Sequence, residues 1–561
     1  HYLSAYNGSR FDHYYLMGIE IDKTLKIDDF ILSNGRVLSG YAAGKKMIDL
    51  NQHIVGSLKK NLIENNCSVA KGDINHDESV AWEDTTEGRK LQVKEYLKCD
   101  VMGLMELYEK INEVMYDNFQ VNICNHVTGS SLCYKLWVQK FLGDIKIRLP
   151  DLTLYNISRQ AVYGGRCYPV KRGFASSQLE DVVKGKKGYD DVDDYLFDAD
   201  IVSMYPHVME ANNYPVGNYR RWNKEWNVKS DVKRKLVCGQ LVPDYLGIYF
   251  IYYTPPTDLI TQPLLAKKTL TGLMWDLLPG EGYYTTVDIV NAVNHGYHVV
   301  FDHGYYWMQS DRVFSAYVNY FYEAKRKATK GSAAYTSAKI NLNALYGKQL
   351  QREIVEKKTL IGTSEEFWNL LQGHQITHMR QVKSKWLVVH KPIAEESVSP
   401  SKPTFLGAFI LSYSRVLATK YYDRLCLPSM SNAEKLLAMP YYMDTDSMVV
   451  KSDFVKLLGV SKDLGGIDND VDGKILEAYF VAPKLYGFKY ITPKNEIKFH
   501  LRGKGIDNNK LAFEDMRAMA LEGKSFEYFR DFSIKKHHLS NNPAPEGFDV
   551  FTHQHIEGED T

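Results

Sequence analysis

The sequence predicts a multidomain protein that mixes α/β and α+β architecture, and three observations support this. The chain has 561 residues, more than one hydrophobic core accommodates, so two or more domains are expected. Its composition, 44% hydrophobic and 24% charged, is typical of soluble globular proteins. Short apolar stretches rich in aromatic and β-branched residues alternate with stretches of helical periodicity, which predicts strands interspersed with helices.

Charge, cysteine content and hydropathy exclude several classes of protein. Lys and Arg number 69 and Asp and Glu 68, so the overall charge indicates no polyanionic partner. The seven cysteines are scattered and form no CxxC pair, which favours an intracellular, reducing compartment over a disulfide scaffold or structural zinc site. No run of 18 apolar residues is present, so no membrane partner is expected.

The most informative stretch is residues 441–450, where Asp444 and Asp446 lie between apolar residues. This pattern predicts a hairpin of strand, tight acidic turn and strand. Residues two apart on such a hairpin point to the same side, so the carboxylates would repel each other without a cation between them. Hard oxygen ligands of this kind suit Mg²⁺. On this stretch alone, an ordinary acidic turn is an equally good explanation.

The first 150 residues contain two further acidic positions. A strand-like start runs through an Asn-Gly turn to Asp12, ahead of an expected helix. A long amphipathic helix is expected from Tyr96 to about Met115, and Tyr96 and Asp100 share one of its faces. Either carboxylate could hold a metal, although helix capping or complementarity to the helix dipole would account for each.

Two stretches in the middle of the chain continue the pattern. In residues 158–169 the paired glycines Gly164 and Gly165 allow close approach of backbone to a partner, and Arg166 could grip a phosphate. A flexible interdomain turn explains these glycines equally well. Residues 196–206 predict a strand that ends in a helix-starting turn, with Asp200 facing the hairpin acids.

A predicted helix carries Lys339, Asn343 and Tyr346 at positions i, i+4 and i+7, along one stripe. A stripe of cation, amide and aromatic suits a nucleoside triphosphate, although a solvated amphipathic face is the alternative. Lys325 or Lys327 upstream offers a second phosphate contact.

Basic and aromatic residues also follow the acidic hairpin. They are Lys484 and Tyr486, then Arg502 and Lys504 in a glycine-containing turn. Such a series could follow a nucleic-acid backbone, although a solvated basic turn explains each part separately.

In their order along the chain, these stretches resemble the motifs of family B DNA polymerases. The matching motifs are two exonuclease motifs (Asn7, Phe11, Asp12; Tyr96, Asp100), a YxGG-like connector (Gly164, Gly165), motif A (DxxSxYP from Asp200), motif B (Lys339 to Gly347), motif C (Asp444, Asp446) and KxY (Lys484, Tyr486). Val162 and Ala344 depart from the usual Tyr and Ser of the connector and motif B. Single motifs are weak, and their order across nearly the whole chain carries the resemblance.

Three features are similar to the protein-primed branch, which includes polymerases of adenoviruses, terminal-protein phages, linear plasmids and polinton-like elements. They are the GGRCYP sequence at residues 164–169, long insertions between the motifs, and the GSLKK stretch at residues 56–60. In that stretch Asn61 occupies the position where the branch has an apolar residue.

The resemblance implies an RNase H-like exonuclease domain followed by a right-hand polymerase with palm, fingers and thumb. The first exonuclease motif has no counterpart, so we expect an N-terminally truncated chain with little or no proofreading activity. The implied segments are an exonuclease-like domain (1–150), a connector (151–195), palm (196–236), a first insertion (237–300), fingers (301–349), a second insertion (350–405), palm (406–500) and thumb (501–561).

The resemblance also implies a function: template-directed addition of dNMPs to a 3′-OH by two-metal nucleotidyl transfer, initiated on a hydroxyl of a terminal protein, for a linear viral, plasmid or mobile-element DNA. Asp200 and Asp446 would hold two Mg²⁺ ions, which Mn²⁺ can replace, with support from Asp444 and the Ile201 carbonyl. Tyr205 would close the sugar pocket. The implied dNTP contacts are Lys339, Asn343, Tyr346, Lys325 and Lys327; the implied primer and template contacts are Lys484, Tyr486, Arg502, Lys504, Gly164, Gly165 and Arg166.

Three alternatives stay open. The chain could be a family B polymerase that extends ordinary nucleic-acid primers, a catalytically inactive DNA-binding scaffold, or a nuclease. The presence of Asp200, Asp444 and Asp446 together disfavours the scaffold, and the missing first exonuclease motif disfavours the nuclease.

Overall fold

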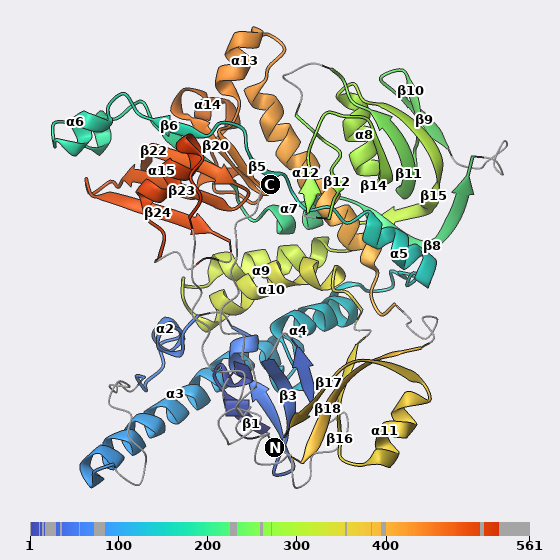
Figure 1. Ribbon diagram of the computed structural model, residues 1–561, viewed down its shortest axis with the longest axis vertical. Coiled ribbons are helices and arrows are strands. Elements are labelled where there is room, and N and C mark those ends of the chain that lie inside the picture. Colours follow the sequence, from blue (N-terminus) through green and yellow to red (C-terminus); the bar gives the residue numbers. More distant parts are fainter. Residues whose placement is uncertain are drawn as a thin grey trace. The chain divides into compact units, whose positions relative to one another are not determined.

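The computed structural model describes residues 2–10, 12–13, 16, 30–33, 36–54, 56–71, 85–224, 233–257, 262–270, 272–353, 356–382, 384–393, 400–504, 506 and 510–526. Their chain divides between two compact units (Figure 1). The described part of the first unit lies within residues 1–144 and 314–401, and that of the second within residues 145–313 and 402–532. The predicted fingers segment, 301–349, is therefore cut at residue 314. The eight-segment division otherwise stays a prediction.

The first unit contains a four-stranded sheet and a set of helices. The strands, in spatial order, are β1 (Tyr2–Ala5), β4 (Lys45–Asp49), β3 (Arg36–Ala42) and β2 (Ile31–Ser33); β1 runs parallel to β4, and the other pairs are antiparallel. The helices are α2 (Leu58–Glu64), α3 (Glu87–Phe119), α4 (Gly129–Leu136), α9 (Ser315–Lys327) and α10 (Ala333–Gln349). Short 3-10 turns lie at Gly8–Arg10, Leu50–Gln52 and Ile123–Asn125, and a π-helical turn at Trp137–Phe141.

Helix α3 confirms the predicted long helix and extends it at both ends. Thr86 caps its first turn by accepting a hydrogen bond from the Arg89 amide, and Gln120 ends it in the left-handed conformation. Its buried positions recur every four residues, as expected for one packed face: Gly103, Leu107, Ile111, Met115 and Phe119.

The second predicted insertion forms a small sheet in the first unit. Strands β16 (Lys357–Ile361), β18 (Lys385–Pro392) and β17 (His374–Val382) pair antiparallel in that order, beside helix α11 (Ser364–Leu371). Leu360 and Leu387 share a buried cluster with Val37 and Met47 of the first sheet. The insertion therefore takes part in the core of this unit.

A nine-stranded sheet is the main element of the second unit. Its path is β24 (Ile497–Gly503), β23 (Leu485–Ile491), β22 (Lys474–Ala482), β7 (Leu196–Ile201), β20 (Ser447–Lys451), β19 (Tyr442–Asp444) and β5 (Cys167–Pro169), with β21 (Ile467–Asn469) beside β7 and β6 (Gly173–Ala175) beside β22. Apolar side chains from β7 and β20 pack against helix α12 (Thr404–Leu425).

Other helices of this unit surround the sheet. They are α5 (Leu152–Gln160), α6 (Leu179–Val183), α7 (Met204–Ala211), α13 (Asn432–Ala438), α14 (Val455–Leu458) and α15 (Phe513–Glu522), with 3-10 turns at Tyr189–Asp191 and Ser452–Phe454. Most of the predicted thumb, from residue 527 on, lies outside the described residues.

A second sheet in this unit contains the first predicted insertion. Its antiparallel strands are β14 (Gly280–Thr285), β11 (Gly247–Thr254), β15 (His298–Asp311) and β8 (Tyr214–Asn223), with helix α8 (Thr286–Asn294) against them (Figure 1). Two small hairpins accompany it: β9 (Arg234–Val237) with β10 (Gln240–Pro243), and β12 (Lys267–Lys268) with β13 (Leu273–Met274). Because β8 pairs with β15, the boundaries predicted at 237 and 300 cut through this sheet.

None of the helices that the structure describes combines the length and the apolar character needed to cross a lipid bilayer.

Candidate active site

The acidic hairpin forms as predicted, with one difference in where its carboxylates lie. Strands β19 and β20 pair antiparallel with Asp444 opposite Ser447, so Thr445 and Asp446 make a two-residue loop. Thr445 takes the left-handed conformation, with φ at 66°, and the Asp446 amide donates to the Asp444 carbonyl at 2.7 Å. Asp446 therefore lies in the turn rather than on a strand, and the charge of Asp444 is among the causes that raise its pKa.

Strand β7 places Asp200 beside this turn. In the register of the sheet Asp200 lies opposite Ser447, and the Ile201 amide donates to the Asp446 carbonyl at 2.8 Å. Burial raises the pKa of Asp200 to about 8, and the nearby charge of Asp446 is the next cause. Burial also raises the pKa of Asp446. The structure thus brings together the two carboxylates that sequence motifs A and C assign to metal binding.

Three further carboxylates lie close by, and sequence reasoning missed all of them. Asp468 lies opposite Asp200 on β21, and the Asp470 amide donates to the Asp198 carbonyl at 3.0 Å. Asp198 is only 5% exposed, and burial together with the charge of Asp470 raises its pKa to about 7. The available signal was the repeated acid-x-acid spacing at 198–200 and 468–470, which lies outside the family motifs.

The carboxylates near the end of β7 and in the β19–β20 turn fit a hard divalent cation. Asp200 and Asp446 offer carboxylate oxygens, and closely spaced negative charge disfavours ionisation until a cation compensates it. Among the described residues no three His, Cys, Asp or Glu side chains are grouped as a metal site.

Asp444 has a different partner from Asp446. Its Oδ1 forms an ion pair with the Nζ of Lys484, and the Lys484 amide donates to the Tyr442 hydroxyl at 2.6 Å. Lys484 itself has a left-handed backbone, with φ at 61°, in the turn between β22 and β23. The lysine of the KxY motif is therefore attached directly to the acidic hairpin.

The remaining predicted primer contacts gather next to Lys484. Tyr486 packs against Tyr442 at 5.0 Å between ring centroids and lies opposite Arg502 in the β23–β24 pair. The Lys504 amide donates to the Lys484 carbonyl at 3.0 Å. Arg502 and Lys504 are exposed, so one edge of the sheet presents a basic and aromatic surface.

The connector packs on the acidic turn, and this corrects the predicted role of Arg166. A Cβ added to Gly165 would lie 2.7 Å from the Cα of Thr445, so glycine is needed for close approach to the turn. Gly164 has more room, since its added Cβ would meet only a Leu273 methyl, at 3.6 Å. Arg166 is 2% exposed and bonds to helix α12, a placement that does not fit the predicted grip on a DNA phosphate.

Tyr205 lies in the first turn of α7, directly after β7, and is half-buried against the cluster that joins β7 to α12. Its position just beyond Asp200 and Ile201 is the one expected from motif A.

Helix α10, in the first unit, confirms the predicted stripe. Lys339 and Asn343 are exposed and Tyr346 is half-buried, whereas the opposite face buries Ala338, Leu342 and Leu345 among others. Lys339 and Asn343 line a cleft of about 870 Å³ that also contains Lys60 and Lys330.

The two candidate lysines of α9 differ in their surroundings. Lys325 is half-buried with its Nζ 5.9 Å from the Tyr335 ring centroid, and burial followed by the charge of Lys339 lowers its pKa. Lys327 is exposed at the end of the helix. Lys325 is therefore the lysine that accompanies Lys339.

The exonuclease-like residues also lie in the first unit. The Asn7 amide donates at 2.7 Å to Asp49, a buried carboxylate that sequence reasoning missed and that also accepts from the Ser9 and Asn51 amides. Asp12 is exposed. Tyr96 and Asp100 interact along α3, as their spacing predicts.

Of this set, Phe11 lies outside the described residues.

Comparisons with known proteins agree with this arrangement. Residues 45–424 match the family described as DNA polymerase type B, organellar and viral. The chain is 26% identical over 438 residues to a probable DNA polymerase of Ascobolus immersus, covering 76% of this chain and 32% of that protein. It is 27% identical over 239 residues to the DNA polymerase of human adenovirus E serotype 4, covering 40% of this chain and 18% of that protein.

The fold is similar to that of phi29 DNA polymerase solved with primer-template DNA and incoming nucleotide. The TM-score is 0.65 at 17% identity, over 95% of this chain and 88% of that one. This likeness shows the right-hand fold that the motifs predict. The chain spans about a third of the length of the Ascobolus relative and 42% of a Neurospora intermedia relative.

Proposed function

Because the chain belongs to the organellar and viral type B DNA polymerases, we propose that it is a DNA-directed DNA polymerase that adds dNMPs to a 3′-OH. One observation carries this proposal: Asp200 and Asp446 lie close together where the Ile201 amide of β7 bonds to the Asp446 carbonyl of the acidic turn. Lys484 forms an ion pair with Asp444 of the same hairpin. A scaffold that only binds DNA has no use for two unneutralised carboxylates held together in this way.

The side chains divide the work of nucleotidyl transfer. Asp200 and Asp446 hold the divalent cations, Mg²⁺ or Mn²⁺, and Asp444 holds Lys484 next to them. Bound cations would lower the pKa of the attacking hydroxyl and stabilise the leaving pyrophosphate. Tyr205 packs against the sugar of the incoming nucleotide.

Cationic and aromatic side chains bind the substrates. On α10, Lys339, Asn343 and Tyr346 bind the dNTP, with Lys325 as a second phosphate contact and Lys327 nearer the end of α9. Lys484, Tyr486, Arg502 and Lys504 follow the primer strand, and the exposed Arg502 and Lys504 neutralise its phosphates.

We further infer that initiation uses a protein primer, a Ser, Thr or Tyr hydroxyl of a terminal protein, on a linear replicon. The GGRCYP connector and the GSLKK helix start support this inference. So do the two insertions and the likeness in fold to phi29 polymerase. Residues of both insertions pack into hydrophobic clusters of their units.

Primer extension with Asp446→Asn tests the polymerase assignment. With Mg²⁺ and a primed template, we expect the variant to lose about 10³-fold or more in rate, because one carboxylate ligand is replaced by a neutral amide. Asp453→Asn is the matched control, since Asp453 is an exposed acid beyond the same hairpin and pairs with Lys451. Extension by Asp446→Asn at near wild-type rate would contradict the site.

A second assay separates protein priming from nucleic-acid priming. Purified candidate terminal protein, origin DNA and labelled dNTP are incubated without any oligonucleotide. Covalent label on the terminal protein supports protein priming, whereas label only when an oligonucleotide is supplied favours the nucleic-acid-primed alternative.

A further inference from the structure

We propose that the buried pair Asp288–Arg415 positions the acidic turn by holding the connector that packs against it. The inference rests on the proposed polymerase function and adds two positioning residues to it. Neither residue belongs to a sequence motif discussed above, and neither contacts Asp200 or Asp446 directly. Three links carry the argument: from α8 to α12, from α12 to the connector, and from the connector to the turn.

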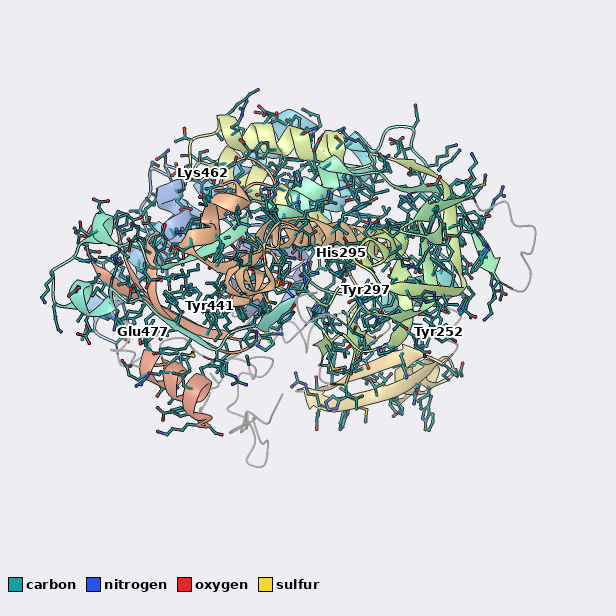
Figure 2. The ribbon with its side chains drawn as sticks, turned by 90° about the horizontal axis from the view of Figure 1, so that it is seen from above. Tyr252, His295, Tyr297, Tyr441, Lys462 and Glu477 are labelled. Atoms are coloured by element: carbon teal, nitrogen blue, oxygen red, sulfur yellow. The ribbon has the colours of Figure 1, made fainter. Side chains whose placement is uncertain are left out.

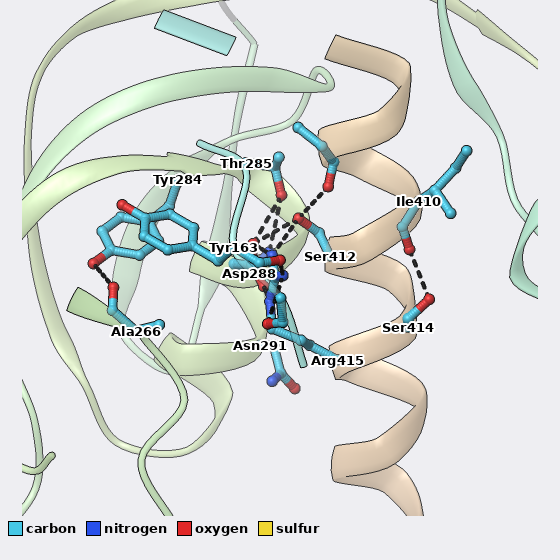
Figure 3. A network of polar contacts seen from close by, with 12 residues as sticks. Tyr163, Ala266, Tyr284, Thr285, Asp288, Asn291, Ile410, Ser412, Ser414 and Arg415 are labelled. Atoms are coloured by element: carbon cyan, nitrogen blue, oxygen red, sulfur yellow. Dashed lines mark hydrogen bonds and ion pairs between the residues drawn. The ribbon is translucent and has the colours of Figure 1, made fainter. Parts of the chain in front are cut away.

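The first link is a bidentate ion pair between helices α8 and α12 (Figure 3). Arg415 Nε donates to Asp288 Oδ1 at 3.0 Å, and Arg415 Nη2 donates to Oδ2 at 2.6 Å. The Ser412 hydroxyl donates to the same Oδ2 at 2.6 Å. The side chains of the pair are only 4% and 3% exposed, so their charges depend on each other.

The second link runs from the remaining guanidinium nitrogen to the connector. Arg415 Nη1 donates to the carbonyl of Tyr163 and, at 3.4 Å, to that of Gly164. In the reverse direction, Arg166 of the connector bonds to α12: its Nη2 donates to the Arg415 carbonyl at 3.1 Å and to Thr419 Oγ1 at 2.9 Å. Two buried guanidinium groups therefore attach residues 163–166 to α12.

The third link joins the connector to the turn itself. The Thr445 amide donates to the Arg166 carbonyl at 2.7 Å, and Cys167 pairs with Asp444 across β5 and β19. Gly165 lies so close to Thr445 that even a methyl group would not fit. Any shift of the connector would therefore be transmitted to the turn that holds Asp444 and Asp446.

Arginine suits this role because its fork bonds two partners in fixed directions. Asp288 occupies Nε and Nη2, which fixes the plane of the guanidinium and directs Nη1 at the Tyr163 carbonyl. A lysine at 415 could keep the charge, but it could not bond the carboxylate twice and the carbonyl once with the same geometry.

The test uses a neutral replacement of the pair, Asp288→Leu with Arg415→Met in one chain. Removing both charges leaves no uncompensated buried charge, so the fold can persist while the connector contacts are lost. We expect kcat for primer extension to fall about 10- to 100-fold, because the turn is no longer held in place. KM for primer-template should stay within about three-fold, since the DNA-binding surface is untouched. Arg415→Lys serves as a second variant and is expected to lower kcat in the same direction.

The matched control breaks another link between the same two helices. His295, which follows α8 and is labelled in Figure 2, bonds to the Asn291 carbonyl at 2.7 Å and contacts Asp423 of α12 at 3.2 Å. His295→Gln should lower thermal stability and leave kcat within about two-fold of wild type. An equal loss of kcat in this control would show that general helix docking matters, and would overturn the proposal.

A second readout is independent of catalysis. Hydrogen exchange of peptides covering residues 440–450 reports on the Thr445 amide, which bonds to the Arg166 carbonyl. We expect exchange about ten-fold faster in the double variant or in Arg415→Lys, and unchanged exchange in His295→Gln. Unchanged exchange and kcat in a folded variant would overturn the proposal. An inactive wild-type protein would instead overturn the polymerase assignment. Hydrogen exchange of residues 440–450 would still test whether the Asp288–Arg415 pair positions the acidic turn.

Discussion

Two groups of carboxylates in the second unit, the buried Asp288 and the half-buried Asp200 with Asp446, differ in how their charge is compensated. Asp288 receives two guanidinium donors and a hydroxyl, all within 3.0 Å. Asp200 has carboxylates for neighbours, and burial with the charge of Asp446 raises its pKa to about 8. The compensated pair holds helices and connector in place. In the uncompensated group, near the end of the central strand β7, the carboxylates repel each other, as expected of a site that a cation completes.

The largest expected effect is on activity, at the uncompensated group. Asp200→Asn should lower the primer-extension rate about 10³-fold or more, because an amide is a poor ligand for a hard cation. The same change should raise the melting temperature in metal-free buffer at pH 8, since it removes a buried like charge. Differential scanning calorimetry beside the extension assay measures both, and a fall in melting temperature would contradict the comparison.

The next largest effect is a loss of stability when the compensated pair is broken, opposite in sign to the gain expected for Asp200→Asn. Asp288→Asn leaves the Arg415 charge buried with a neutral partner, which costs about 3–5 kcal/mol of unfolding free energy. Urea unfolding followed by circular dichroism measures this. Asp244→Asn, which breaks an exposed pair with Lys235 in the same unit, is the control and should cost less than about 1 kcal/mol.

A smaller effect tests whether the connector transmits position to the turn. Gly165→Ala places a methyl 2.7 Å from the Thr445 Cα and must displace the turn. We expect a loss in kcat of about 10- to 100-fold. Gly164→Ala, whose methyl meets only Leu273 at 3.6 Å, should cost much less. Equal losses in both variants would instead favour the predicted contact of both glycines with DNA.

The smallest effect is the pH dependence of stability. The pKa of Asp200 is raised from 3.8 to about 8, so the folded state holds its proton more tightly than the unfolded chain does. Without metal, stability should therefore be highest below about pH 4 for this group and fall as pH rises towards 8. Asp200 is only half-buried, so solvent screens the effect and the slope should stay well below the limit of about 1.4 kcal/mol per pH unit for one proton. Mg²⁺ should restore more stability at pH 8 than at pH 6, and Asp200→Asn should flatten the slope.

Local chemistry made several parts of the structure predictable. The acidic hairpin follows from its flanking apolar strands, and the exposure of Lys339 and Asn343 follows from the helical period of residues 333–349. These signals lie within a few residues of one another. The predicted order of motifs likewise indicated the right-hand fold that the comparison with phi29 polymerase shows.

Contacts between distant segments could not be predicted in this way. Arginine is a residue type expected at a phosphate contact, yet the Arg166 guanidinium bonds to helix α12, 249 positions along the chain. Asp198 was overlooked because its neighbour Asp470, whose charge adds to burial in raising the pKa of Asp198, is far away in the sequence and follows β21, which pairs with β7. The boundary at 237 missed the pairing of β8 with β15, since neither strand alone indicates its partner.

Strand β5 also bears on how the protein behaves at high concentration. It is the last strand on its side of the nine-stranded sheet, three residues long, and it ends at Pro169, which has no amide hydrogen to offer. Short, proline-terminated edges resist the addition of a strand from another molecule. By covering β19, the connector therefore also protects the hairpin from self-association. Variants that loosen it should aggregate more readily, which light scattering would detect.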